Sequence, residues 1–310
     1  MLVMQLDGYG AALRAVEHPE PRPGPGQVRI RTAAATVNPV DWLTADGVLA
    51  ALAPHLEPPF VLGWDVAGTV DAVGDGAPYA VGQAVAGMSP WFARGVGTFA
   101  EAVVLDADQV APVPDGLDLA EAATVPLNGQ TARQALDLAD VRPGRTLLVT
   151  GASGAVGGFA VQLAAREGVE VVADASNGDE ERVRSLGAAQ VLPRTAAPDE
   201  LAAAVRRARP DGVDAVLDAV PVGPPLIAAV RDGGTFVTVL DPAVPAAERG
   251  VRVAKVSVSP DPRQLAALLA DVEAGRLVST VAKQFPLADA PEAFAVAARG
   301  GLRGKVVLVP

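Results

Sequence analysis

A glycine-rich segment between an apolar run and a helical pattern is the first place where residue spacing suggests chemistry. It reads Val149-Thr-Gly-Ala-Ser-Gly-Ala-Val-Gly-Gly and has G-x-x-G-x-x-G spacing. Glycines at such points permit a tight turn, let the backbone approach a pyrophosphate, and let the helix pack closely on the sheet. The first N–H groups of the helix then point at the phosphates. The segment predicts a dinucleotide site formed by Gly151, Ser153, Gly154, Ala155, Val156 and Gly157.

Asp174 stands at the end of the next predicted strand, which begins at Glu170. A carboxylate there accepts hydrogen bonds from the ribose hydroxyls of NAD and repels the 2′-phosphate of NADP. Ser176 and Arg182 follow and could instead hold that phosphate. A solvated strand end without a ligand is the third interpretation of Asp174. These residues leave all three open.

The elements that would position this loop alternate between strand and helix. Apolar strands are predicted at 146–150, 170–173, 189–192, 213–218 and 234–239, with helices at 159–166, 180–186, 198–208, 226–230 and 262–274 between and after them. Such alternation predicts a doubly wound parallel sheet. We therefore expect an α/β chain with a Rossmann dinucleotide-binding domain over 121–275.

The flanking regions have a different pattern. Residues 1–120 are rich in Gly and Pro and carry short Val-rich runs such as Asp65-Val-Ala-Gly-Thr-Val, which is typical of a β-rich barrel-like unit. Residues 276–310 contain similar strand-like pieces and are expected to return to that unit. The predicted domains are thus 1–120 with 276–310, and 121–275.

Composition narrows the function classes. The chain has 310 residues and no cysteine, which excludes disulfides, thiol catalysis and thiolate zinc ligands. His18 and His55 have no neighbour at ligand spacing, so no metal site is expected. A net charge of -11 disfavours nucleic acid and anionic membranes as partners. The sequence shows no signal peptide and no apolar run long enough for a membrane helix, so we expect a cytoplasmic protein.

Several motifs together resemble one family. They are Val37-Asn-Pro-Val-Asp-Trp, Leu62-Gly-Trp-Asp-Val-Ala-Gly-Thr-Val, Gly97-Thr-Phe-Ala-Glu, Asn128-Gly-Gln-Thr-Ala, the glycine loop and Gly304-Lys-Val-Val-Leu. In this order they resemble the zinc-free quinone oxidoreductase branch of the medium-chain dehydrogenase/reductase superfamily, over most of the chain. Zinc-dependent members carry Cys where Asn38 stands and Gly-His-Glu in place of Gly63-Trp-Asp. The resemblance implies a GroES-like catalytic domain beside the Rossmann domain, and hydride transfer from NAD(P)H to a quinone or an α,β-unsaturated carbonyl.

The resemblance also implies roles for single residues. Asn38 would lie beside the nicotinamide and offer its amide to the substrate oxygen, while Asp41 would fix the loop. Thr131 would contact the nicotinamide, and Val239 with Leu240 would line its carboxamide. Many members use NADPH, and Arg194 together with Ser176 and Arg182 is compatible with it. We therefore expect NADPH, with NADH not excluded. The tryptophans are either cleft walls or ordinary packing residues: Trp42, Trp64 and Trp91.

Two departures from the family pattern leave alternatives open. Related enoyl reductases often supply a proton from a tyrosine shortly after Asn-Pro-x-Asp, but here Thr44, Asp46 or water would have to serve. The usual Gly-Gly after the strand ending at Asp218 is replaced by Pro221-Val222. A cyclase, a lyase or a cofactor-binding protein without redox turnover is therefore the alternative. Members are commonly dimers, and residues 234–239 and 251–258 are the expected contact.

Overall fold

The computed structural model of the chain describes residues 1–194, 197–240 and 244–310. It divides into two compact units. Unit 1 contains Met1–Gln130 and Ser259–Pro310, and unit 2 contains Thr131–Val258. Residues 121–130 and 259–275 therefore belong to the β-rich unit 1, whereas the sequence pattern assigned them to the Rossmann domain.

Unit 1 is built on a seven-stranded sheet in which β15, β16, β3, β5, β6 and β8 follow one another and β7 pairs with β3. A smaller sheet has the order β2-β1-β4. Alternate residues of the long strand β3 are buried in a core of Val and Ile side chains, as expected for a sheet with one face covered. The strands are β1 (Leu2–Leu6), β2 (Arg14–Glu17), β3 (Gln27–Val37), β4 (Phe60–Val61), β5 (Asp65–Val73), β6 (Ala84–Met88), β7 (Ala102–Asp106), β8 (Val110–Pro112), β15 (Val281–Pro286) and β16 (Lys305–Val309).

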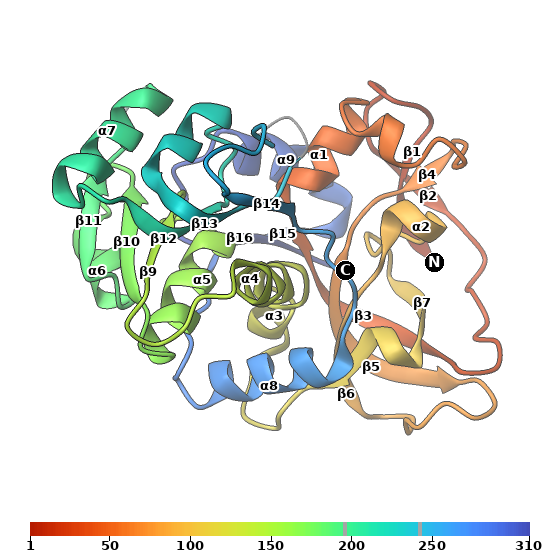
Figure 1. Cartoon of the computed structure of the whole chain (residues 1–310). Coiled ribbons are helices and arrows are strands. Elements are labelled where there is room, and N and C mark those ends of the chain that lie inside the picture. Colours follow the sequence, from red (N-terminus) through yellow and green to blue (C-terminus); the bar gives the residue numbers. More distant parts are fainter. Residues whose placement is uncertain (195–196, 241–243) are drawn as a thin grey trace. The chain divides into compact units, whose positions relative to one another are not determined.

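The return of the final segment to the first β-rich region is confirmed. Strand β16 pairs antiparallel with β3, and β15 pairs parallel with β16. In Figure 1 the blue strand β16 belongs to the same sheet as the orange-red β3. Unit 2 is consequently a continuous insertion between the two parts of unit 1.

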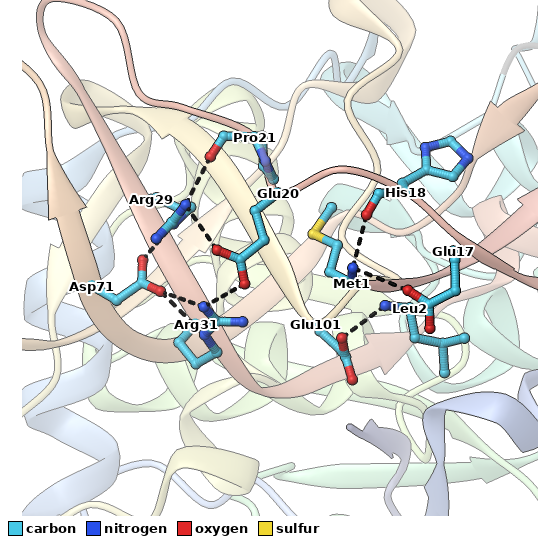
Figure 2. Close-up of polar contacts among 10 residues, drawn as sticks. All are labelled: Met1, Leu2, Glu17, His18, Glu20, Pro21, Arg29, Arg31, Asp71 and Glu101. Carbon is cyan, nitrogen blue, oxygen red and sulfur yellow. Dashed lines mark hydrogen bonds and ion pairs between the residues drawn. The ribbon is translucent and has the colours of Figure 1, made fainter.

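Polar contacts tie the first strands of unit 1 to the larger sheet (Figure 2). The Leu2 N–H donates to Glu101 at 2.7 Å, and the Met1 ammonium donates to the carbonyl of His18 at 2.7 Å. A second group joins Arg29 and Arg31 to the carboxylates of Glu20 and Asp71. These groups are at or near the surface, so they mainly fix the path of the chain.

Short helices close unit 1. They are α1 (Pro39–Ala45), η1 (Ala50–Leu52), α2 (Trp91–Arg94), η2 (Ala107–Gln109), α3 (Leu119–Ala122), α8 (Pro262–Glu273), η5 (Leu287–Asp289) and α9 (Ala290–Ala298). Asp261 caps α8, and its own N–H donates to the side chain of Gln130 at 2.7 Å. Leu268 of α8 lies beside Gly129. These contacts explain why α8 and the start of α4 (Pro126–Ala139) pack with unit 1.

Unit 2 has the predicted parallel sheet, in which β14 joins the five predicted strands, and the strand order is β11-β10-β9-β12-β13-β14 (Figure 1). Its strands are β9 (Thr146–Val149), β10 (Glu170–Ala175), β11 (Gln190–Pro193), β12 (Val213–Asp218), β13 (Val230–Thr238) and β14 (Arg252–Lys255), and its helices are α5 (Ala155–Arg166), α6 (Glu180–Ser185), α7 (Pro198–Ala208) and η3 (Pro224–Ala229). The helix predicted at 226–230 is the 3₁₀ helix η3, because two prolines open it and remove backbone donors.

Candidate functional site

The three glycines of the loop differ in how much space surrounds them. Gly151 has φ +62°, and a Cβ there would lie 2.1 Å from the Val220 side chain. At Gly157 a Cβ would lie 2.3 Å from the carbonyl oxygen of Gly151. At Gly154 the nearest atom is the same oxygen at 3.2 Å, and no other neighbour lies within 4 Å. The loop therefore turns at Gly151, packs at Gly157 and leaves the backbone open at Gly154, which fits a bound pyrophosphate.

Helix α5 supplies donors at the open side of this loop. Gly154 is its N-cap and carries no side chain that could satisfy the first N–H groups. The first turn of any helix leaves such N–H groups without intrahelical partners, and the helix dipole favours an anion there. The loop and α5 together suit a dinucleotide.

Asp174 lies beneath this loop. Its side chain is 3% exposed, and Oδ2 accepts from the Gly151 N–H at 3.3 Å and from Arg194 Nε at 3.2 Å. Oδ1 is buried and has no hydrogen-bond partner among the described residues. In this arrangement the carboxylate supports the loop, and its charge is balanced by Arg194.

The remaining residues predicted for the adenosine end gather at the end of β10. The Ser176 N–H donates to the Ser153 hydroxyl at 3.3 Å, and Arg182 donates to the Ser153 carbonyl at 3.1 Å. The Arg194 N–H donates to the carbonyl of Ala175 at 2.9 Å. Two guanidinium groups and a hydroxyl are thus available for a phosphate.

The segment after β12 is fixed beside the glycine loop. The buried Asp218 carboxylate accepts from the Thr150 hydroxyl at 2.8 Å and from the N–H groups of Val222 and Gly223, each at 3.1 Å. Burial raises the pKa of Asp218. The Pro221-Val222 departure is therefore accommodated in an ordered loop that places Val220 against Gly151.

Val239 and Leu240 follow β13, so they lie at the same carboxyl edge of the sheet as the glycine loop. Thr131 is buried within α4. The structure thus brings the predicted cofactor residues of unit 2 to one edge, where ligands of doubly wound sheets bind.

Unit 1 has a second candidate site, where three strands meet. Val37 of β3 is paired with Val306 of β16, and Thr36 with Asp65 of β5. The residues next to these pairs therefore converge. Lys305 Nζ donates to Asn38 Oδ1 at 2.7 Å, and Asn38 Nδ2 donates to Asp65 Oδ2 at 2.7 Å.

Asn38 is the centre of this cluster and is 1% exposed. Its oxygen also accepts from Asn128 Nδ2 at 3.0 Å, and its nitrogen also donates to the Thr36 carbonyl at 3.1 Å. Both amide hydrogens and both lone pairs are therefore engaged within the protein. A substrate oxygen can accept a hydrogen bond from Asn38 Nδ2 only if it displaces Thr36 or Asp65. The bond to the Thr36 carbonyl is the longer and weaker of these two.

Asp41 completes the cluster from α1. Its Oδ2 accepts from the Asn38 N–H at 2.8 Å, so it fixes the start of the helix. Burial raises the pKa of Asp41 to about 8 and that of Asp65 to about 7. Burial also lowers the pKa of Lys305 to about 8, although the charges of Asp65 and Asp41 oppose that change.

Asp65, Asn128 and Lys305 are not among the site residues that the sequence predicts. All three stand in the family motifs, and Asp65 and Lys305 are the first residues of their strands. A charged residue at the start of such a strand was the available signal. Their meeting depends on strand pairing over long sequence distances, which the pattern does not specify.

Two of the tryptophans are packing residues. Trp91 is fully buried, donates to the Val61 carbonyl at 2.7 Å and packs edge-on against Phe60. Trp64 packs edge-on against Phe92. Trp42, on α1, is partly exposed. Within the described ranges no three His, Cys, Asp or Glu side chains are grouped to hold a metal ion.

Comparison with known proteins matches both parts of the chain to family models. Residues 24–115 match the alcohol dehydrogenase GroES-like domain, and residues 186–308 match the family described as zinc-binding dehydrogenase. A quinone oxidoreductase structure from Coxiella burnetii has 28% identity, a TM-score of 0.90, and covers 100% of this chain and 99% of its own. The 2-methylene-furan-3-one reductase of Solanum lycopersicum is 31% identical over 92% of this chain and 72% of that protein.

The chain belongs to the zinc-free quinone oxidoreductase branch of the medium-chain dehydrogenase/reductase superfamily. The predicted GroES-like and Rossmann fold is thereby confirmed. Some relatives match this chain over only part of their own length. Quinone-oxidoreductase QR1 from Triphysaria versicolor is 36% identical over 62% of this chain, and the match spans 60% of that protein. The polyketide synthase component PikAII from Streptomyces venezuelae is 42% identical over 59% of this chain, and the match spans 5% of that protein. A mycobacterial protein solved with NADPH has a TM-score of 0.87 and 29% identity over all of both chains.

Proposed function

We propose that the chain transfers a hydride from NADPH to a quinone or an α,β-unsaturated carbonyl compound without a metal ion. The glycine loop is the observation that carries this proposal, because it is open only at Gly154, where a pyrophosphate must approach. Relatives named as a quinone oxidoreductase and a 2-methylene-furan-3-one reductase support the acceptor class. Asn38 and Trp64 stand where zinc-dependent relatives carry metal ligands, which supports a metal-free reaction.

The residues at the end of β10 support NADPH over NADH. Asp174 is buried and paired with Arg194, so it is poorly placed to accept hydrogen bonds from the ribose hydroxyls of NADH. Arg182, Arg194 and Ser176 offer positive charge and a hydroxyl for the 2′-phosphate. The neighbour solved with NADPH adds support from outside the chain.

NADPH, when bound, supplies the hydride. The protein has to bind the acceptor and stabilise the negative charge that develops on its oxygen. We assign this task to the cluster around Asn38, whose weaker hydrogen bond to the Thr36 carbonyl can be exchanged for one to the acceptor. Thr131 is assigned to the nicotinamide end, and Asp41 holds Asn38 in place.

The first test mixes the purified protein with NADPH or NADH and with quinone and enone acceptors, and follows the absorbance of the reduced cofactor. Oxidation that depends on both cofactor and acceptor is expected. Cofactor binding without oxidation by any acceptor would refute the reductase and favour the redox-inactive alternative. No binding of either dinucleotide would refute the function of the glycine loop.

Arg194→Ala tests the choice of cofactor. We expect the Kd for NADPH to rise at least tenfold, corresponding to about 1.4 kcal/mol, while the Kd for NADH stays within about twofold. Arg184→Ala on α6 is a matched control, because it removes the same exposed charge from a helix beside the site. If Arg194→Ala weakens the binding of NADPH and NADH equally, the arginine does not contact the 2′-phosphate and acts only by balancing the charge of Asp174.

We further propose a cytoplasmic homodimer. Strand β14 is an edge strand of the parallel sheet, and an exposed edge presents unpaired backbone groups to a second chain. In the described part of the chain, no helix is long and apolar enough to cross a membrane. Light scattering of the purified protein tests the dimer.

A further inference from the structure

Helix α1 carries two buried polar atoms that have no hydrogen-bond partner among the described residues. They are Asp41 Oδ1 and Thr44 Oγ1, and both residues are 1% exposed. Residues three positions apart on a helix are neighbours on one face. A buried polar atom without a partner is costly, so two of them on one face of α1 call for an explanation.

Asp41 is also part of a buried group of charges. The ionisable side chains that face it are Asp65 from β5 and Lys305 from β16. With both carboxyls ionised and the lysine protonated, this group would carry a net charge of minus one in the protein interior. Burying an unbalanced charge is much more costly than burying a neutral group, so the group retains one additional proton.

The hydrogen bonds indicate which carboxyl holds that proton. Asp65 accepts from Asn38 Nδ2 at 2.7 Å and from the Leu127 N–H at 2.6 Å, so both of its oxygens have donors. Asp41 accepts from the Asn38 N–H on Oδ2, and the Gly63 N–H also favours its carboxylate form, but Oδ1 has no hydrogen-bond partner among the described residues. The carboxylate form of Asp41 is therefore less well stabilised, and burial raises its pKa to about 8 against about 7 for Asp65.

The proposed reaction needs a proton in addition to the hydride. No tyrosine follows the Asn-Pro-x-Asp motif here, since residues 42–47 read Trp-Leu-Thr-Ala-Asp-Gly. We propose that the buried group of Asp41, Asp65 and Lys305 stores the proton that completes the reduction, and that Thr44 relays it from Asp41 to the reduced acceptor. This inference rests on the proposed function and extends it to the source of the proton.

Reduction of an enone takes up one hydride and one proton. Hydride addition to the β-carbon moves the carbon–carbon π electrons toward the carbonyl oxygen and gives an enolate. Thr44 gives its hydroxyl proton to the α-carbon and takes the Asp41 proton, because a hydroxyl both donates and accepts. Asp41 becomes a carboxylate next to Lys305 and is reprotonated from water. The sum is one enone, one NADPH and one proton converted to a saturated carbonyl and NADP.

Thr44→Val is the decisive variant, because it keeps the shape of the side chain and removes only the hydroxyl. With NADPH and an enone we expect kcat to fall roughly 100-fold, the lower end of general acid–base contributions. The Kd for NADPH should not change, and Thr44→Ser should restore most of kcat. Thr32→Val is the matched control, because Thr32 is another buried threonine of unit 1 with an unpartnered hydroxyl.

The pH profile provides the second readout. Wild-type kcat should fall as the pH rises through about 8, where Asp41 loses its proton. Asp41→Asn should lower kcat and abolish this alkaline decrease. Infrared spectra of the protein without cofactor should show a protonated carboxyl band near neutral pH that Asp41→Asn removes.

The outcomes separate the inference from the proposed function. If the wild type reduces the enone but Thr44→Val keeps its kcat and alkaline decrease, the relay is refuted and the function stands. If the infrared band is absent near neutral pH, the stored proton is refuted whatever the activity. If the wild type reduces no acceptor, the proposed function itself fails.

Discussion

Gly154 at the N-cap of α5 and Gly157 and Gly158 within the helix have different surroundings, so replacing each by alanine should have a different outcome. Gly154→Ala places a methyl group 3.2 Å from the Gly151 carbonyl oxygen and near no other atom, so the fold should tolerate it after that oxygen shifts by a few tenths of an ångström. Loss of the glycine N-cap costs at most about 1 kcal/mol. The methyl group occupies the approach of the pyrophosphate, however, and we expect the Kd for NADPH to rise at least tenfold, or about 1.4 kcal/mol.

Gly157→Ala should damage the fold instead. Its Cβ would lie 2.3 Å from the Gly151 oxygen, 2.7 Å from the Gly151 carbonyl carbon and 2.9 Å from the Ala152 Cα. All three are backbone atoms, which cannot rotate away. Overpacking of this kind costs about 1–3 kcal/mol, and the better helix propensity of alanine returns about 1 kcal/mol. We expect a net loss of about 1–2 kcal/mol and weaker NADPH binding through a displaced loop.

Gly158→Ala is the matched control in the next position of α5. Its Cβ would meet the Ala152 oxygen at 3.6 Å and the Leu186 side chain at 3.7 Å, which are ordinary contacts. We expect a gain of up to about 1 kcal/mol and unchanged NADPH binding. Urea unfolding and cofactor fluorescence titration measure both quantities for all three variants. NADPH binding of Gly154→Ala equal to wild type, or equal stability losses at Gly157 and Gly158, would contradict the reasoning.

Two further predictions concern stability. Asp214→Ala should lower the free energy of urea unfolding by about 2–3 kcal/mol, because it removes the acceptor of hydrogen bonds from Thr146, Arg145 and Arg231. Asp214→Asn should lower it by less. Equal losses in the two variants would show that the negative charge of Asp214 does not contribute to stability. Burial alone would raise the pKa of Asp214, but these donors hold it well below its ordinary value, so its stabilisation is present above about pH 4 and lost in acid. The stabilising effect of Asp41 depends on pH in the opposite direction, because its pKa is raised in the folded state. This effect is fully present below about pH 4 and is lost as the pH rises through about 8. The thermal midpoint of the wild type should therefore fall more steeply between about pH 5 and 7 than that of Asp41→Asn, and parallel curves would refute this.

The sequence predicted most of unit 2, because all of its strands except β14 and all of its helices have a local signal. Helix α7 and strand β12 begin and end at the predicted residues. The domain boundaries differ from those expected, because α3 and α8 pack on strands of unit 1, and that packing depends on tertiary contacts. The motifs predicted the family, which relatives and solved structures confirmed.

The candidate site shows the limit of motif transfer. Asn38 was expected to offer its amide to a substrate, but the motif does not show that Lys305, Asn128, Asp65 and Thr36 already occupy that amide. For Asp174 the sequence leaves a ribose contact, a nearby phosphate site and a solvated strand end open, and in the structure its carboxylate lies under the glycine loop. The roles assigned to both residues stay predictions until the variants are measured. Residue type and spacing indicate which groups are available, and the direction of each side chain depends on contacts made far along the chain.

Lys305 stands 267 positions after Asn38, and this separation affects how the protein assembles during synthesis. Unit 2 is a continuous segment and can fold as soon as it leaves the ribosome. The sheet of unit 1 has to wait for β15 and β16, and until then Asp41 and Asp65 lack the ammonium group that balances them. A nascent chain that has not reached Lys305 therefore has two acidic groups at a site that only the complete sheet can bury without a net charge. Closure of unit 1 is consequently a late event, which comes only after the whole of unit 2 has been made.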